Sequence, residues 1–458
     1  MAITAVPALV EVLRHSRLLD QGKIDTLTQT LHSQFTEAES LARELVQQGW
    51  LTPYQMEQLL LGKGEDLVLG QYVLMEPVGK GNVGQIYKAR HLKRGHVVAL
   101  KVIRQERRAD AQVLRRFRRE VRAVTRLAHP NLIKACDIEE VGNAHFYAME
   151  YILGVNLDQL ITKGGAMPIA PACDYIRQAA LGLQHAHERS LIHRDIKPAN
   201  LLIAPAVPAE AGKPGQPAQT QAPRGNLGRW GTVKVLDLGL ALLQHPLQAG
   251  GNTQALTQVG FALGTADYMA PEQVMKPHEV DIRADLYGLG CTFYHMLTGK
   301  PPFPQGSLLA KLQAHQFKDA VPVEQLRPDV PPSLAGVIRK LMAKRPEDRY
   351  QKPAELADAL TRILSRFENT ALATDWKLPA ELTETLAAGR KRITQMPRVA
   401  APALVKGRPK RTTQFPVPLQ KLELEQEEKP VPRVIPVGVV IVAFVLSFLV
   451  VWLLFAPR

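Results

Sequence analysis

A change of pattern near Gln71 most constrains what this chain of 458 residues can fold into. From there to Ile103 the sequence is β-rich and broken by glycines, in QYVLMEPVGKGNVGQIYKARH and HVVALKVI. Short runs of this kind, bounded by turn residues, predict an antiparallel sheet. Helical patterns return at Arg115 and continue to about Ser365. We therefore expect a sheet followed by a larger helical region, in a chain long enough for two or three domains.

Residues 1–65 precede this region and have helical patterns of their own. The stretch ALVEVLRHSRLL spaces its apolar residues for one buried helix face. Two further helices carry start and stop signals. In the first, Thr36 is the N-cap, Glu39 completes the capping box and Gly49 ends the helix. In the second, Thr52 is the N-cap, Pro53 lies in the first turn, Gln55 completes the box and Gly62 ends the helix. Nothing in this part suggests chemistry, so we interpret it as a helical accessory module for docking or regulation.

Two stretches have the composition of an insertion and a linker. Residues 204–231, APAVPAEAGKPGQPAQTQAPRGNLGRWG, are dominated by Pro, Gly, Ala and Gln. Such a segment cannot bury enough apolar surface to offset its ordering entropy, which predicts a disordered surface insertion between two strands. Residues 366–433 are interpreted as a basic linker that contains proline.

Residues 434–455 contain no charged side chain. A helix of that length rises about 33 Å, which is enough for the hydrocarbon core of a bilayer. The alternative is a buried core helix, but so long an uncharged run at the end of the chain has no partner left to bury it. Basic residues on its N-terminal side, including Lys429 and Arg433, predict that the large N-terminal part stays in the cytoplasm. The sequence therefore predicts a single-pass cell-membrane protein with a transmembrane helix at 434–455.

The formal net charge of +14 raises the question of nucleic acid as a partner. Much of the excess lies in the linker, close to the predicted membrane span, where it more simply meets anionic lipid. Nucleic acid is therefore not expected. Cys136, Cys173 and Cys291 stand far apart without metal-ligand spacing, so they are interpreted as small buried apolar residues in a reducing compartment.

A glycine-rich turn lies within the predicted sheet. Gly79, Gly81 and Gly84 have the spacing GxGxxG, and glycine lets backbone amides approach phosphate oxygens closely. A dinucleotide site would continue into a helix, whereas QIYKAR predicts a strand, so a hairpin over a nucleotide is favoured. Lys101 follows on an apolar strand, where its charge needs an anion, either phosphate or the carboxylate of Glu120.

The stretch HRDIKPAN supplies groups for chemistry. Asp195 can accept or orient the proton of an attacking hydroxyl, and Lys197 can neutralise charge that develops on a phosphoryl group. Asn200 and, after the insertion, Asp237 in VLDLG offer the oxygen ligands that Mg²⁺ prefers.

Taken together, the glycine-rich turn, VALK, the helix glutamate, HRDxxxxN, DxG and APE resemble a eukaryotic-type Ser/Thr protein kinase over about Tyr72 to Leu364. The combination with a C-terminal apolar span is similar to bacterial membrane-anchored kinases of this type. The resemblance implies an α+β, bilobal protein-kinase fold over residues 71–365, with a small antiparallel β lobe carrying one helix and a larger helical lobe.

The resemblance also implies site residues and cofactors. ATP and Mg²⁺ are the implied cofactors, with Asp195 and Lys197 as catalytic residues and Asn200 and Asp237 as metal ligands. The residues implied to bind ATP are Gly79, Lys80, Gly81, Asn82, Val83, Gly84, Ile86, Ala99, Lys101, Glu120, Met149, Glu150 and Ile152.

Further positions follow from the resemblance. Glu272 is expected to pair with Arg349, and Asp285 to lie buried on a helix and steady the catalytic loop. Leu238 stands where the family usually has Phe and is expected to pack in the same apolar place. The substrate loop GTADYMAPE, which contains Thr265 and Tyr268, favours Ser/Thr acceptors in proteins.

Regulation by phosphorylation is a further hypothesis. In this family an arginine at the place of Arg194 often pairs with a phosphorylated residue of the activation loop. Thr253 and Thr257 are the candidate hydroxyls, and a homodimer could phosphorylate them in trans. The alternative for the Arg-rich stretch RRFRRE is a solvated face.

Other functions remain open at this point. A pseudokinase scaffold could share the fold, although Lys101, Glu120, Asp195, Asn200 and Asp237 are all present. A small-molecule kinase is disfavoured by the APE and GT motifs. The expected function is transfer of the γ-phosphoryl group of ATP to Ser/Thr hydroxyls of proteins, in membrane-associated signalling.

Overall fold

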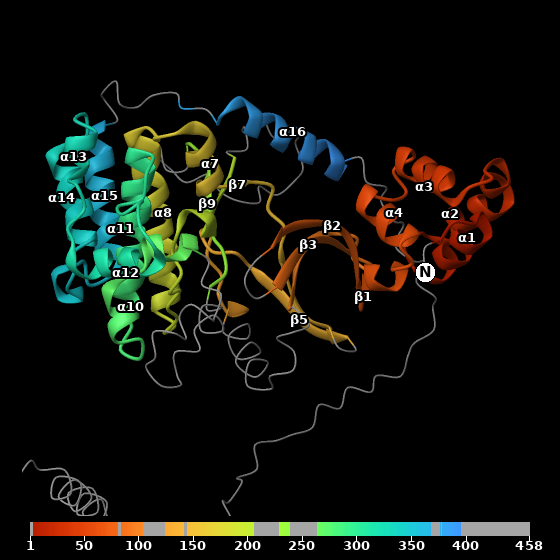
Figure 1. The fold of residues 1–458 in the computed structure, drawn as a ribbon, viewed down its shortest axis with the longest axis horizontal. Coiled ribbons are helices and arrows are strands. Elements are labelled where there is room, and N and C mark those ends of the chain that lie inside the picture. The colour runs from red at the N-terminus through yellow and green to blue at the C-terminus, as the bar shows by residue number, and fades with distance from the viewer. Residues whose placement is uncertain are drawn as a thin grey trace, which may run out of the picture. The chain divides into compact units, whose positions relative to one another are not determined.

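The computed structural model describes residues 3–80, 84–103, 124–141, 144–205, 229–238, 263–367, 376 and 378–394 (Figure 1). These residues belong to one compact unit, Met1–Ala403, and the second unit, Leu404–Arg458, lies outside them. The predictions for Gly81, Asn82, Val83, Glu120, Thr253, Thr257 and the run 434–455 therefore fall outside the described residues.

Helices precede the sheet, as the sequence predicts. They are α1 (Val6–His15), α2 (Gln21–Thr26), α3 (Ala38–Gln47) and α4 (Pro53–Leu60). The capping box of α4 is confirmed, because Gln55 N donates to Thr52 Oγ1 at 3.1 Å and Thr52 N donates to Gln55 Oε1 at 2.9 Å. Gly49 and Gly62 have φ angles of 70° and 71° just past the ends of α3 and α4, a conformation that glycine adopts without strain.

The start of α3 differs from the prediction. Its N-cap is Glu37, whose side chain makes no capping bond, so the box predicted from Thr36 and Glu39 is wrong. Glu37 forms a β-bridge with Ala5, and the N–H of the first helical residue donates to Thr4 O at 3.1 Å. A backbone carbonyl therefore binds a free N–H group of the first turn, and the chain before α3 is held extended.

A six-stranded sheet follows, and the predicted antiparallel pairing is confirmed. Its spatial order is β1-β2-β3-β4-β6-β5. The strands are β1 (Val68–Leu69), β2 (Tyr72–Lys80), β3 (Gly84–His91), β4 (Val97–Ile103), β5 (Ala135–Val141) and β6 (Ala144–Glu150). The one helix expected in this lobe falls on residues 104–123, outside the described residues.

The N-terminal helices and the sheet share one apolar core. Leu9, Leu41 and Leu59 of the helices are fully buried in the same cluster as Leu100 and Phe146 of the sheet. Burial of aliphatic and aromatic side chains on this scale stabilises a fixed contact.

The larger lobe is helical. Its central helices, α8 (Ile169–His187) and α11 (Ile282–Thr298), are buried along most of their length, as their predominantly apolar and small residues require. The remaining helices are α7 (Leu157–Gly164), α10 (Pro271–Met275), α12 (Leu308–Phe317), α13 (Val323–Leu326), α14 (Pro332–Leu341), α15 (Pro353–Phe367) and α16 (Ala380–Thr394) (Figure 1). The chain thus has an antiparallel β lobe and a helical lobe.

A small sheet borders the predicted insertion. It consists of β7 (Val155–Asn156), β8 (Leu201–Ala204) and β9 (Thr232–Val235). Ala204, the first residue of the predicted insertion, belongs to β8, and Gly231 O accepts a hydrogen bond from Gln178 Nε2 at 3.0 Å. Both ends of the insertion are therefore tied to the fold, and residues 206–228 lie outside the described residues.

Across the described ranges, no helix has both the length and the apolar character needed to cross a membrane.

Candidate active site

The glycine-rich turn joins β2 to β3. Gly79 pairs with Ile86 across the hairpin, and Gln85 Nε2 donates to Gly79 O at 2.7 Å. A Cβ at Gly84 would lie 2.0 Å from Val102 O of β4, so only glycine allows this close approach. A Cβ at Gly79 would meet nothing within 4 Å, which leaves open space beside the turn.

Lys101 on β4 forms a buried ion pair with Asp237, which follows β9. Lys101 Nζ donates to Asp237 Oδ1 at 2.6 Å, and the lysine side chain is 3% exposed. Burial alone would raise the pKa of Asp237, but the Lys101 ammonium outweighs it and holds that pKa below its usual range. The sequence did not predict this pair, because its two members are 136 residues apart and it named Glu120 as the partner.

The catalytic-loop residues meet in one hydrogen-bonded chain. Lys197 Nζ lies 2.9 Å from Asp195 Oδ2 and donates to Thr265 Oγ1 at 2.8 Å. Asn200 Nδ2 donates to Asp195 O at 2.7 Å and to Asp195 Oδ2 at 3.1 Å. Asp195 and Lys197 thus lie beside the substrate loop.

Asp285 of α11 holds the loop around Asp195 in place, as predicted. Its two carboxylate oxygens accept the backbone N–H groups of His193 at 2.8 Å and Arg194 at 2.6 Å. Burial raises the pKa of Asp285, although these N–H groups act in the opposite direction. Arg194 has a φ of 66°, so the two bonds hold a backbone conformation that a non-glycine residue rarely adopts.

His193 is a functional residue that the sequence reasoning missed. Its side chain is fully buried, and Nε2 lies 2.6 Å from Leu236 O while Nδ1 accepts from Asp195 N at 3.2 Å. It therefore connects Asp195 with the residue before Asp237. Its place next to Arg194 and Asp195 in HRD was the signal that could have revealed it.

Asn200 and Asp237 have the chemistry of a Mg²⁺ site. Leu236 N donates to Asn200 O at 2.9 Å, which brings the chain before Asp237 to Asn200. With Nδ2 of Asn200 engaged by Asp195, its Oδ1 is the amide atom left to coordinate a cation. Carboxylate and amide oxygens are suitable ligands for Mg²⁺, so these two residues fit the ion.

Apolar residues assigned to the ATP site gather in one cluster. Ala99 and Met149 are buried, and Ile86 and Ile152 pack against them partly buried. The Glu150 carboxylate is engaged elsewhere, since it accepts from Lys134 N and from Lys234 Nζ, both at 2.8 Å. Its backbone N–H donates to Lys134 O at 2.9 Å, so any contact of Glu150 with a nucleotide would come from its backbone carbonyl.

Two other predicted contacts are confirmed. Arg349 donates to both carboxylate oxygens of Glu272, at 2.6 and 2.9 Å, in a buried pair. Leu238 is 2% exposed and belongs to the core of the helical lobe, which is the apolar packing expected there.

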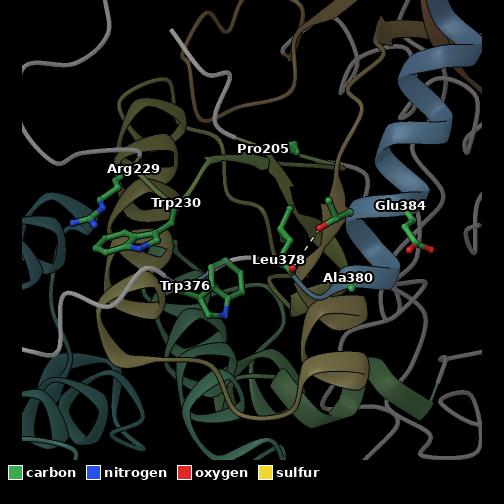
Figure 2. Close-up of a pocket in the computed structure, with 8 residues that line it drawn as sticks. Pro205, Arg229, Trp230, Trp376, Leu378, Ala380 and Glu384 are labelled. Atoms are coloured by element: carbon green, nitrogen blue, oxygen red, sulfur yellow. Dashed lines mark hydrogen bonds between the residues drawn. The ribbon is translucent and has the colours of Figure 1, made fainter.

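A separate pocket of about 570 Å³ lies beside the start of α16 (Figure 2). Its lining residues are Pro205, Arg229, Trp230, Trp376, Leu378, Ala380, Thr383 and Glu384. No residue assigned to ATP, Mg²⁺ or catalysis lines it. We therefore place the candidate active site at Lys101, Asp195 and Asp237 instead.

Comparison with known proteins gives the family. The protein kinase domain model matches residues 72–360. The chain is similar to serine/threonine-protein kinase PknB of Mycolicibacterium smegmatis, with 35% identity over 299 residues, covering 64% of this chain and 43% of that protein. PknB of Mycobacterium tuberculosis is 33% identical over 297 residues, again covering 64% and 43%. The match thus spans less than half the length of these relatives.

A solved structure, the PknI kinase domain of Mycobacterium tuberculosis, matches with a TM-score of 0.46 and 26% identity, covering 64% of this chain and 97% of that chain. The family model alone covers more than half of this chain. The chain belongs to the protein kinase domain family.

Proposed function

We propose that this protein transfers the γ-phosphoryl group of ATP to serine and threonine hydroxyls of proteins, as a membrane-associated signalling enzyme. The observation that carries the proposal is the Lys101–Asp237 ion pair at 2.6 Å. It joins β4 of the sheet lobe to the segment just after β9. Lys101, the residue proposed for the nucleotide, thereby contacts Asp237, the residue proposed for the metal, and Leu236 N beside it donates to Asn200 O at 2.9 Å.

Each residue then has a chemical role. Asp195 orients the acceptor hydroxyl and takes its proton as the oxygen attacks the γ-phosphorus. Lys197 neutralises negative charge as the bond to the ADP oxygen breaks. Lys101 holds the α- and β-phosphates, and the backbone of the turn at Gly79 covers them.

Asn200 and Asp237 would hold Mg²⁺. When bound, the ion would supply positive charge that neutralises the phosphate groups. The cluster of Ile86, Ala99, Met149 and Ile152 offers an apolar surface for the adenine ring.

The contact of Lys197 with Thr265 supports Ser/Thr acceptors, because it connects the catalytic lysine directly to the GTADY substrate loop. The curated relatives named above are serine/threonine-protein kinases, which supports the same choice. A catalytically weak pseudokinase scaffold is the second candidate, but a scaffold has no need of the polar chain around Asp195.

Location and assembly are part of the proposal. Residues 434–455 would anchor the protein in the cell membrane with the kinase domain in the cytoplasm. Two copies would phosphorylate Thr253 or Thr257 in trans, where Arg194 can pair with the new charge.

Phosphoamino-acid identification tests the acceptor class. The purified full chain is incubated with Mg-ATP and a set of candidate proteins, and the modified residues are located by mass spectrometry. Phosphoserine and phosphothreonine are expected. Phosphate on tyrosine alone would reject the Ser/Thr assignment, and absence of any protein phosphate would favour the scaffold.

A further inference from the structure

Helix α4 reaches the strand that leads into the glycine-rich turn. Gln55 Nε2 donates to Leu74 O of β2 at 2.7 Å, and Thr52 Oγ1 donates to Met75 O. Gln55 is 6% exposed, and the two strand residues are similarly buried. The same two side chains also form the capping box of α4, so one motif both starts the helix and binds the strand.

The strand is irregular where these bonds are made. Leu74 pairs with Ala89 and Glu76 pairs with Lys88, which leaves Met75 as an extra residue without a partner in β3. A bulge leaves its extra residue outside the ladder, and a buried carbonyl without a donor is costly. Thr52 supplies a donor to the carbonyl of this extra residue, and it thereby stabilises the bulge.

The bulge decides how the rest of β2 is oriented. Side chains alternate between the faces of a strand, so removing one residue from the register would turn every later side chain to the other face. Glu76 now faces the buried Lys88, with Nζ and Oε1 3.0 Å apart, and Lys88 Nζ lies 5.3 Å from the centre of the Tyr151 ring. Without the bulge Lys88 would lose this carboxylate.

The same register places Gly79. A second register shift, at Val78, lies between Pro77, which pairs with Tyr87, and Gly79, which pairs with Ile86 and accepts the hydrogen bond of Gln85. The register of Gly79 therefore depends on both shifts, and α4 holds the first of them, at Met75.

The helices that make this contact are fixed to the sheet. Leu59 of α4 is fully buried in the core that also contains Tyr72 and Leu74 of β2. The family model begins at residue 72, so α4 lies outside the part of the chain that the family describes.

We propose that Thr52 and Gln55 are positioning residues for the glycine-rich turn, which act through the bulge at Met75. The N-terminal helices then contribute to nucleotide binding by positioning this turn, and are not only an accessory module. The proposal rests on the proposed function in one respect, namely that the turn covers the phosphates of ATP.

Gln55→Glu separates positioning from capping. Glutamate at this place keeps the acceptor for Thr52 N, as capping boxes contain Glu or Gln alike. It loses the N–H donor to Leu74 O and puts two acceptors face to face. Gln159→Glu is the matched control, because Gln159 holds the same place in the capping box of α7 and is exposed to solvent.

Two measurements on the full chain decide the matter. In Gln55→Glu we expect the affinity for Mg-ATP to fall about tenfold. We expect hydrogen exchange of the backbone amides from Glu76 to Lys88 to accelerate by a similar factor, because the buried carbonyl of Leu74 loses its donor. Gln159→Glu should leave both as in the wild type. If Gln55→Glu does not fold, Gln55→Met with Gln159→Met as its control replaces it.

The outcomes separate this proposal from the function. Unchanged exchange between Glu76 and Lys88 would overturn the positioning role, even if the melting temperature falls. Faster exchange with unchanged Mg-ATP affinity would overturn it as well, provided that the wild type binds nucleotide. A wild type that binds no nucleotide would reject the kinase function, and the exchange comparison alone would then decide the role of Gln55.

Discussion

At the scale of single residues, buried polar groups hold the catalytic loop in place. Asp285 and His193 are both almost completely buried: Asp285 accepts the N–H groups of the two residues before Asp195, and His193 bonds to Asp195 N and to Leu236 O. Removing one member of such a network leaves a buried donor or acceptor without a partner. The geometry of Asp195 is therefore imposed by residues that do not touch a substrate.

His315 makes stability depend on pH. Its Nδ1 lies 2.8 Å from Tyr287 OH, and burial, with Lys344 nearby, lowers the pKa of His315 from 6.5 to about 3. Below pH 6.5 the unfolded chain binds a proton there that the folded protein does not bind. The free energy of unfolding should therefore fall as the pH falls, by at most about 1.4 kcal/mol per pH unit from this residue.

Urea unfolding between about pH 8 and about pH 4.5 measures this slope. His315→Leu should unfold at lower urea at all pH values because Tyr287 loses a partner, yet its slope should be shallower than that of the wild type. Equal slopes for the two proteins would show that His315 is protonated in the folded state.

At the scale of elements, one buried ion pair joins the substrate loop to the helical lobe. Arg349 binds Glu272 of α10 and also donates to Arg283 O of α11 and to the carbonyls of Ala343 and Lys344. The planar guanidinium satisfies all of these acceptors at once, which a lysine cannot do.

Arg349→Lys should lower the free energy of unfolding by about 3 kcal/mol, because buried acceptors lose their donors. The matched control is Arg339→Lys, in a pair with Glu324 whose arginine side chain is 67% exposed. That change should cost less than about 0.5 kcal/mol. Chemical denaturation of both variants checks the difference, and similar losses in the two would contradict this account.

The sequence predicted elements better than it predicted contacts between them. The sheet, the box at Thr52 and the pair of Glu272 with Arg349 follow from local patterns or from the order of family motifs. The pair of Lys101 with Asp237 depends on how distant segments fold together, which no local pattern records. The bulge at Met75 was not foreseen either, because it depends on strand register and on a donor from another helix.

At the scale of the whole molecule, the N-terminal helices and both lobes belong to one compact unit, and the helices share an apolar core with the sheet lobe. Residues 434–455 remain a predicted membrane anchor, and only their sequence supports it. The linker, residues 366–433, is rich in basic residues that would contact anionic lipid.

Truncation after Arg433 tests the anchor. The full chain should remain in the membrane pellet after a carbonate wash, and the truncated chain should move to the supernatant. Replacing Val445 by Arg is a finer test, since a charge near the middle of a span costs about 3 kcal/mol and should weaken insertion. A full chain that washes off as readily as the truncated one would contradict the anchor.

The most direct test of the whole account is phosphoryl transfer from labelled Mg-ATP to protein, compared between the wild type and Asp195→Ala. The wild type should incorporate phosphate, and the variant should do so roughly a thousandfold more slowly while it still binds nucleotide. Equal incorporation by the two proteins would contradict the central claim that Asp195 carries the reaction.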